Sequence, residues 1–370
     1  MYNAMRIKPI CFAICILISL GTFAQKDDTK VKRFKDTLDG AFDASEFLIN
    51  HNGVLPIVSP ITEPAVGYGG VLAGVYFVTK EDPRDRPDLI IGAAGITSNG
   101  TWLAGGGYIG FWKKDSQRYQ GFAGYADANL EYYGFGNNKA FDFEINSFFF
   151  MQKILFRING SPFFIGGKYQ LTKTNVPIFE GNNIIDPIDF DLWNSGVSLI
   201  TEFDNLNNFM SPNAGTKIHL SYDQNLQFLG SDRNWGTINF HTHHYKTVNE
   251  KWMAAFRLES NWATGNIPFY AQPFVDLRGV PALRYQGSAT ALFETEHHYN
   301  LNNRWSVLAF AGGGTAFESY DNFNADEFVW NAGGGFRYLI ARIFGLRLGV
   351  DVARGPEEWA FYVTAGTSWR

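Results

Sequence analysis

The sequence has very little cysteine, and after its first residues it has no long apolar run. Only two of its 370 residues are cysteine, Cys11 and Cys15, and both lie near the N-terminus. Disulfides and thiolate chemistry are therefore excluded for the rest of the chain. No stretch after residue 24 approaches the roughly 20 consecutive apolar residues that a membrane-spanning helix requires.

Excess positive charge is also missing. The chain carries 31 Lys and Arg against 36 Asp and Glu, a formal net charge of −5. Proteins that bind nucleic acids need a basic surface for the phosphates, and no run of basic residues supplies one here. We therefore expect no nucleic-acid partner.

The N-terminus resembles a secretory signal. Arg6 and Lys8 precede an uncharged apolar run over residues 10–23, and Ala24 follows it before Gln25. The alternative is a single membrane anchor, but the run is shorter than the roughly 20 residues needed to span a bilayer. We predict a signal peptide over residues 1–24, with cleavage after Ala24.

The next part of the chain, residues 25–65, is predicted to be a short periplasmic or plug-forming segment. Asp43 and Glu46 are spaced as in a capping box and predict one short helix. Pro56 and Pro60 then favour an extended entry into the sheet that follows.

Aromatic residues and glycine are abundant: the chain has 39 Gly, 34 Phe, 17 Tyr and 10 Trp. Such a composition suits many strands joined by tight turns, with aromatic girdles at two interfaces. Fifteen strand-like segments can be recognised, at residues 66–80, 88–98, 100–113, 118–133, 143–157, 160–173, 190–204, 214–227, 235–248, 251–263, 285–300, 304–317, 328–340, 344–354 and 358–370. A single-chain barrel of this kind needs an even number, so we expect one strand to be missed or merged before residue 160.

The stretch GLRLGVDVARG, residues 345–355, alternates strictly. Leu348 and Val350 would share one face of a strand, while Arg347 and Asp351 would share the other. Either a soluble half-buried sheet or a strand between lipid and a wet interior would give this pattern. The signal peptide and the many aromatic residues favour the second. We predict an all-β transmembrane antiparallel barrel over residues 66–370, with sixteen strands preferred and fourteen or twelve as alternatives.

The last predicted strand, residues 358–370, ends in GTSWR. Gly366 and Trp369 are interpreted as a terminal-strand signal, with Trp369 facing lipid. The seam of the barrel would then lie between residues 66–80 and 358–369.

Residues 269–369 resemble the C-terminal part of the BamA/TamA/FhaC superfamily of outer-membrane insertases and translocators. The best marker is Leu277-Arg278-Gly279 in the long loop before the strand of Glu296, similar to the arginine-glycine motif of the loop that folds back into the barrel in that family. The resemblance implies a barrel in the outer membrane of a Gram-negative bacterium. It also implies a role in membrane biogenesis or translocation, a polypeptide or lipid client, periplasmic or outer-membrane partner proteins, and no cofactor.

The sequence departs from the family pattern in three places. Gly312 stands where a second acidic residue is expected, and Val280 stands where the family prefers an aromatic residue. The 41 residues between the predicted signal and the predicted barrel are too few for a POTRA domain. Because of these departures, the resemblance supports the fold more firmly than the activity.

An arginine carried into a barrel lumen can bind carboxylates bidentately and so order a loop that would otherwise cost much entropy. We expect Arg278 to pair with Glu296, with Glu294 and Asp351 as further candidate partners. The alternative is that Arg278 is a solvated loop charge and Glu296 a residue of the lumen wall.

Motifs for chemistry are weak. His241 and His243 would share one strand face, but no clear third ligand stands nearby, so no metal site is predicted. Residues 105–110 fit G-x-G-x-x-G without the following helix that a dinucleotide site needs. We therefore expect a protein that is not an enzyme. A passive pore and an outer-membrane enzyme remain the rival interpretations.

Overall fold

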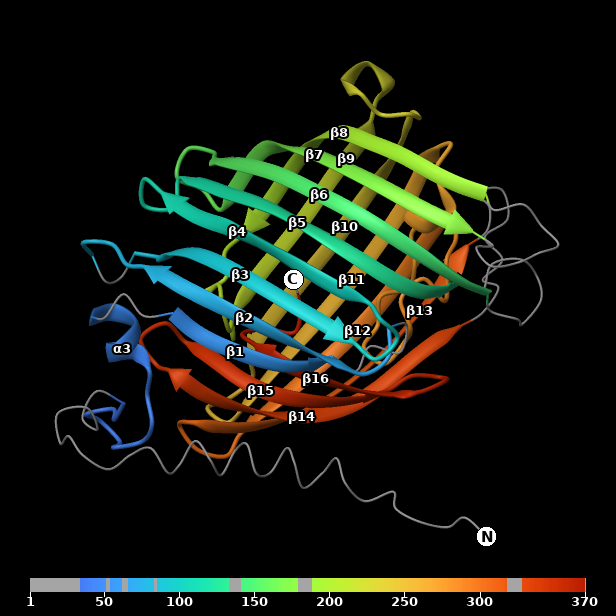
Figure 1. Cartoon of the computed structure of the whole chain (residues 1–370). Coiled ribbons are helices and arrows are strands. Elements are labelled where there is room, and N and C mark those ends of the chain that lie inside the picture. The colour runs from blue at the N-terminus through green and yellow to red at the C-terminus, as the bar shows by residue number, and fades with distance from the viewer. Residues whose placement is uncertain are drawn as a thin grey trace, which may run out of the picture.

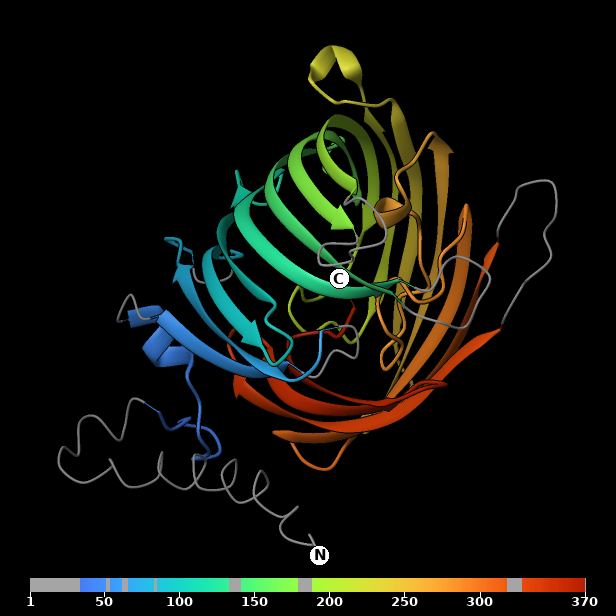
Figure 2. The ribbon, with the colours of Figure 1, turned by 45° about the vertical axis from the view of Figure 1, so that its right-hand side comes forward.

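The computed structural model describes residues 34–50, 54–61, 66–82, 85–132, 141–178, 188–317 and 328–369, and the predicted signal peptide lies outside them. Within these ranges the chain forms one sheet of sixteen antiparallel strands, hydrogen-bonded in sequence order. The sheet curls into a barrel (Figures 1 and 2). This confirms the predicted all-β barrel and its preferred strand number. No helix among the described residues is long and apolar enough to span a membrane.

The strands are β1 (Val54–Ile61), β2 (Gly69–Val78), β3 (Asp88–Thr97), β4 (Trp102–Trp112), β5 (Gln117–Tyr132), β6 (Phe141–Arg157), β7 (Phe163–Ile178), β8 (Ile188–Asp204), β9 (Gly215–Asn225), β10 (Trp235–Thr247), β11 (Trp252–Gly265), β12 (Ala289–Asn300), β13 (Trp305–Phe317), β14 (Val329–Ala341), β15 (Leu346–Arg354) and β16 (Trp359–Ala365). A short helix, α3 (Ser45–Asn50), precedes them, and the 3-10 helices η1 (Gln227–Leu229) and η2 (Phe269–Ala271) lie in two of the loops.

The strand missing from the sequence-based prediction is β1. The predicted boundary at residue 66 is wrong, because residues 54–61 already pair with β2 over the whole of β1. Pro56 and Pro60 predict only an extended entry into the sheet, but proline is tolerated in an edge strand, where the missing N–H needs no partner. β1 is such a strand, since it ends the strand order. The predicted seam at residues 66–80 is wrong for the same reason: the strands that meet at the seam are β1 and β16.

Alternating residues face the outside and the lumen. In β14, Trp330 and Phe336 are 43% and 44% exposed, whereas Asn331 and Arg337, the residues that follow them in the sequence, are 2% and 1% exposed. In β15, Asp351 is fully buried. Apolar side chains therefore form the outer surface, and polar ones line the interior, as the alternation in residues 345–355 predicted.

The barrel has two different rims. Short turns such as 113–116, 301–304 and 342–345 lie at one rim, which we call the turn rim, and the long loop 266–288 lies at the other, the loop rim. The segment of α3 lies beside the turn rim (Figure 1).

The end of the chain turns into the barrel, and both views place the C-terminus within its outline (Figures 1 and 2). β16 ends at Ala365, and Gly366 adopts a φ of +85°, which only glycine enters without strain. Trp369 is consequently 4% exposed and packs against Tyr245 and Met253. The predicted lipid-facing position of Trp369 is therefore wrong, because the strand period stops at Gly366.

Candidate functional site

The loop between β11 and β12, residues 266–288, folds back against the inner wall of the barrel. Its residues Val275, Leu277 and Val280 are at most 4% exposed and pack against Leu292 of β12 and Val329 of β14. Burial of these apolar side chains fixes the position of the loop. Arg278, which lies between them in the sequence, is thereby directed into the lumen.

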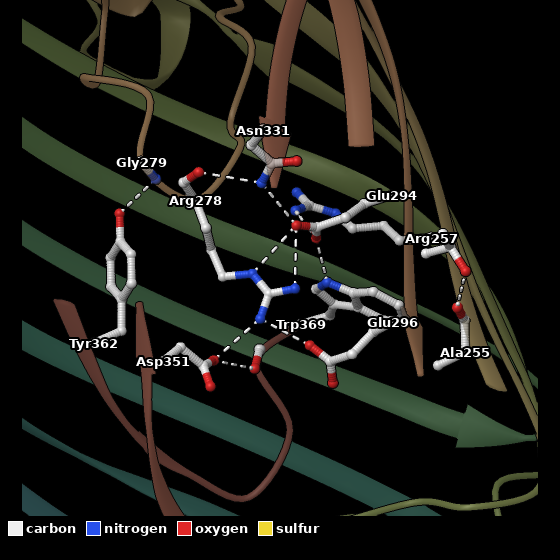
Figure 3. A network of polar contacts seen from close by, with 12 residues as sticks. Ala255, Arg257, Arg278, Gly279, Glu294, Glu296, Asn331, Asp351, Tyr362 and Trp369 are labelled. Atoms are coloured by element: carbon white, nitrogen blue, oxygen red, sulfur yellow. Dashed lines mark hydrogen bonds and ion pairs between the residues drawn. The ribbon is translucent and has the colours of Figure 1, made fainter. Parts of the chain in front are cut away.

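Arg278 meets three carboxylates (Figure 3). Its Nη2 lies 3.1 Å from Glu294 Oε1, and its Nη1 lies 2.7 Å from Glu296 Oε2 and 3.0 Å from Asp351 Oδ2. Its guanidinium carbon also lies 3.4 Å from the ring centroid of Phe310, a cation–π contact. All three candidate carboxylates of the sequence analysis therefore surround the arginine, and the charge is not solvated.

Gly279 brings the loop close to the last hairpin. Its backbone N–H donates to the hydroxyl of Tyr362 in β16 at 2.9 Å. With a φ of +82°, a Cβ at this position would lie 2.9 Å from the backbone nitrogen of Gly355. Glycine is needed here both for the conformation and for the close approach.

Glu294 is the fully buried centre of the site. Besides Arg278, it accepts hydrogen bonds from Asn331 Nδ2 at 2.9 Å and from Trp369 Nε1 at 2.5 Å. A Cβ on Gly312, the position where an acidic residue was expected, would lie 3.0 Å from Cβ of Glu294. A side chain there would crowd Glu294, and Asp351 supplies the further carboxylate instead.

Asp351 connects the site to the end of the chain. It receives two hydrogen bonds from Arg337 of β14, at 2.5 and 2.8 Å. Ser368 lies between the two, since it accepts from Arg337 at 2.9 Å and donates to Asp351 at 3.3 Å. Such bidentate arginine–carboxylate pairs are geometrically specific as well as strong.

The charges of the site compensate one another. Burial alone would lower the pKa of Arg278, but Glu296, Glu294 and Asp351 hold that pKa above its ordinary value. A polar cavity of about 340 Å³, lined by Glu296 and Arg337 among others, adjoins the site. The arrangement thus holds the loop, the strands β12, β14 and β15 and the end of the chain together, beside a polar cavity.

Several residues of the site were not predicted from the sequence. Phe310, Asn331, Arg337 and Tyr362 all contact its members. Asn331 and Arg337 follow Trp330 and Phe336 in β14, so alternation along this strand places them on the side opposite these aromatic residues. Nothing in the sequence indicated that Tyr362 would receive the loop. Gly366, the other residue of the predicted terminal signal, acts by ending β16 rather than by contacting Arg278.

Three histidines also lie in the lumen. His219, His241 and His243 stack in a row with centroid separations of 4.6 and 5.1 Å, and the ring of His243 lies 5.7 Å from that of Trp369. In the described part of the chain, no three His, Cys, Asp or Glu side chains are grouped as metal ligands. The row forms one wall against which Trp369 packs.

Replacing Trp369 with phenylalanine tests its bond to Glu294. Phenylalanine retains the packing against Tyr245 but removes the donor to a buried carboxylate, and hydrogen bonds to charged groups contribute about 1.5 to 3 kcal/mol. We expect a loss of that size in the free energy of unfolding, measured by urea titration in lipid vesicles. Trp305→Phe, at a position 42% exposed on the outer surface, is the control. Equal losses in both variants would contradict the assigned bond.

Comparison with protein-family models gives no match, and comparison with curated proteins gives none either. Solved structures do match. BamA from Haemophilus ducreyi lacking POTRA domains 1–3 is similar with a TM-score of 0.58 and 12% identity, over 92% of this chain and 82% of that one. CdiB from Escherichia coli is similar with a TM-score of 0.55 and 12% identity, over 84% of this chain and 62% of that one. CdiB from Acinetobacter baumannii is similar with a TM-score of 0.57 and 10% identity, over 85% and 59%.

The chain therefore has the fold of the sixteen-stranded outer-membrane barrels. Within that class its fold is that of BamA and CdiB, so the predicted BamA/TamA/FhaC-like barrel is confirmed at the level of the fold. The chain spans less than two thirds of the length of the two CdiB chains.

Proposed function

We propose that the protein works in the outer membrane of a Gram-negative bacterium, in membrane biogenesis or in translocation of a polypeptide or lipid. In this proposal the turn rim faces the periplasm, and the seam between β1 and β16 is the part that opens. The action involves no chemical step and no cofactor. Its client, and periplasmic or outer-membrane partner proteins, would meet the barrel at the seam.

One observation carries the proposal: the strand at the seam is held by the loop inside the lumen. Gly279 binds Tyr362 of β16, and Trp369 beyond β16 binds Glu294, which also pairs with Arg278. Movement of the loop would therefore release the last strand. A loop that only narrowed a pore would not need contacts to the strand at the seam.

The seam is suited to opening. Among the described residues, the ladders of the sheet run from β1 to β16 without one that joins these two strands. Pro56 and Pro60 of β1 lack the N–H that a ladder uses, and their even spacing puts both missing donors on one edge. Unpaired strand edges are templates on which another strand can add.

A cross-link across the seam tests the proposal. The chain has no cysteine beyond Cys15, so cysteines at Val58 of β1 and Phe361 of β16, both exposed on the outer surface, can be joined by a bifunctional maleimide. In a deletion strain of the source bacterium, we expect the unlinked variant to restore outer-membrane integrity and the linked one to fail. The readout is sensitivity to antibiotics that an intact outer membrane excludes.

Each single-cysteine variant, treated with the same reagent, is the control. Full restoration by the cross-linked protein would show that the seam does not need to open. A passive pore would then be the better interpretation, because conduction through the lumen does not depend on the seam.

A further inference from the structure

Residues 34–50, which precede the barrel, form a compact unit at the turn rim. The backbone closes on itself, with Asp36 N–H donating to Ala41 O and Asp43 N–H donating to Phe34 O, each at 2.9 Å. The rings of Phe34 and Phe42 stack with centroids 5.6 Å apart. Asp43 Oδ1 then accepts the N–H of Ser45 at 2.7 Å, where α3 begins. We call residues 34–50 the N-terminal clasp.

One half of the clasp binds two arginines, each in a different turn of the turn rim. Arg304, between β12 and β13, binds three carboxylates. Its Nε lies 2.7 Å from Asp39 Oδ2 and its Nη1 lies 2.6 Å from Asp43 Oδ2, and it also binds Asp36. Its side chain is only 5% exposed. Arg342, between β14 and β15, binds Asp36 as well. The contacts of the buried Arg304 are specific in geometry, unlike isolated surface pairs.

Further hydrogen bonds extend this half along the turn between β14 and β15. The N–H of Ala44 donates to Ile340 O at 2.7 Å, and the hydroxyl of Tyr338 donates to Phe42 O at 2.8 Å. Ile343 N–H donates to the hydroxyl of Ser45 at 3.1 Å. The clasp is therefore fixed to β12–β15, near the C-terminal end of the strand order.

The other half of the clasp packs on the opposite end of the sheet. Leu48 of α3 is 1% exposed and belongs to one apolar cluster with Leu55 of β1, Phe77 of β2 and Leu89 of β3. Phe344 from the turn after β14 joins the same cluster, with its ring 5.2 Å from that of Phe77. Figures 1 and 2 both show α3 beside the ends of β1 and β2.

We infer that the N-terminal clasp holds the seam of the barrel shut at the turn rim. β1–β3 and β12–β15 stand at opposite ends of the strand order, with β16 and the seam between them. A segment bound to both ends resists their separation, and the seam widens at this rim only after the clasp leaves one of them. The inference deepens the proposed function and rests on it for its biological meaning, but its test measures the seam directly.

The carboxylates of the clasp are ionised at neutral pH. Hydrogen bonds from Arg342 and from the N–H of Leu38, with the nearby charge of Arg304, lower the pKa of Asp36 to about 2. Because the pKa is lower in the bound state than the usual value of about 3.9, this contribution is complete above that value. It is lost as the pH falls from about 4 toward about 2, the range in which the clasp is expected to release.

Spin labels can follow the clasp and the seam separately. A label on Leu38→Cys, at a position 76% exposed, reports the mobility of the clasp. A label pair on Val58→Cys and Phe361→Cys reports the distance across the seam. In vesicles, we expect Asp36→Asn with Asp43→Asn to make the Leu38 label mobile and to lengthen and broaden the seam distance. Lowering the pH from about 4 toward about 2 should also make the label at position 38 mobile when Asp36 and Asp43 are unchanged.

Glu81→Gln with Glu250→Gln removes two exposed acidic charges from turns of the same rim and should change neither signal. Leu48→Ala loosens the other half of the clasp and should lengthen the seam distance without altering any charge. A seam distance that stays the same while the Leu38 label becomes mobile would overturn the inference, as would a label that remains immobile in both clasp variants. Neither result would contradict the proposed function, which requires only that the seam opens.

Discussion

Replacing Arg278 with glutamine is expected to turn a barrel that conducts little into one with a larger and noisier single-channel conductance. The substitution removes the positive charge that contacts Glu294, Glu296 and Asp351 together. Removing one partner of a buried ion pair costs about 3 to 5 kcal/mol, because the remaining charge stays buried without compensation. The loop should then leave the lumen wall and enlarge the adjoining cavity.

The measurement is a recording in planar bilayers, with Arg284→Gln as the matched control. Arg284 lies in the same loop, but its pair with Glu357 is longer, at 3.5 Å, and its side chain is 22% exposed. Conductance at the wild-type level in Arg278→Gln would mean that the loop does not obstruct the lumen. An equal rise in the Arg284 variant would mean that any disturbance of the loop suffices, without a special role for the three carboxylates.

The carboxylates of the site could be predicted because they lie on regular strands. Glu294 and Glu296 are two residues apart in β12, and Asp351 alternates with apolar neighbours in β15, so strand period alone places them on the lumen side. The position of Arg278 is different. It depends on a loop whose conformation no strand period determines, and only the resemblance to a known motif pointed to it.

Two features could not be predicted because tertiary context overrides a local signal. Pro56 and Pro60 usually argue against a strand, yet they are accommodated in β1, which has a free edge. Trp369 continues the alternation of β16 in the sequence, but Gly366 with its positive φ turns the chain inward before it. The bond to Glu294 and the row of histidines then supply a polar and an aromatic environment that the sequence could not reveal.

Replacing Gly279 with alanine is expected to release the loop with every charge of the site retained. The φ of +82° disfavours a side chain, and the new Cβ would lie 2.9 Å from the backbone nitrogen of Gly355, which cannot rotate away. The loop tip must therefore move from the hairpin of β15 and β16, and the hydrogen bond to Tyr362 should be lost. We expect a conductance change in the same direction as for Arg278→Gln, with increased protease cleavage in the loop.

Gly230→Ala separates backbone strain from close contact. Gly230 also has a positive φ, +97°, but a Cβ there would meet no atom within 4 Å. This variant carries the conformational cost, roughly 1 kcal/mol, without displacing a neighbour. If Gly279→Ala behaves like Gly230→Ala, contact between loop and hairpin does not hold the loop, and its position depends on the ion pairs and on its buried apolar side chains. If only Gly279→Ala opens the barrel, the last hairpin and the loop move as one unit, which is the coupling that opening at the seam requires.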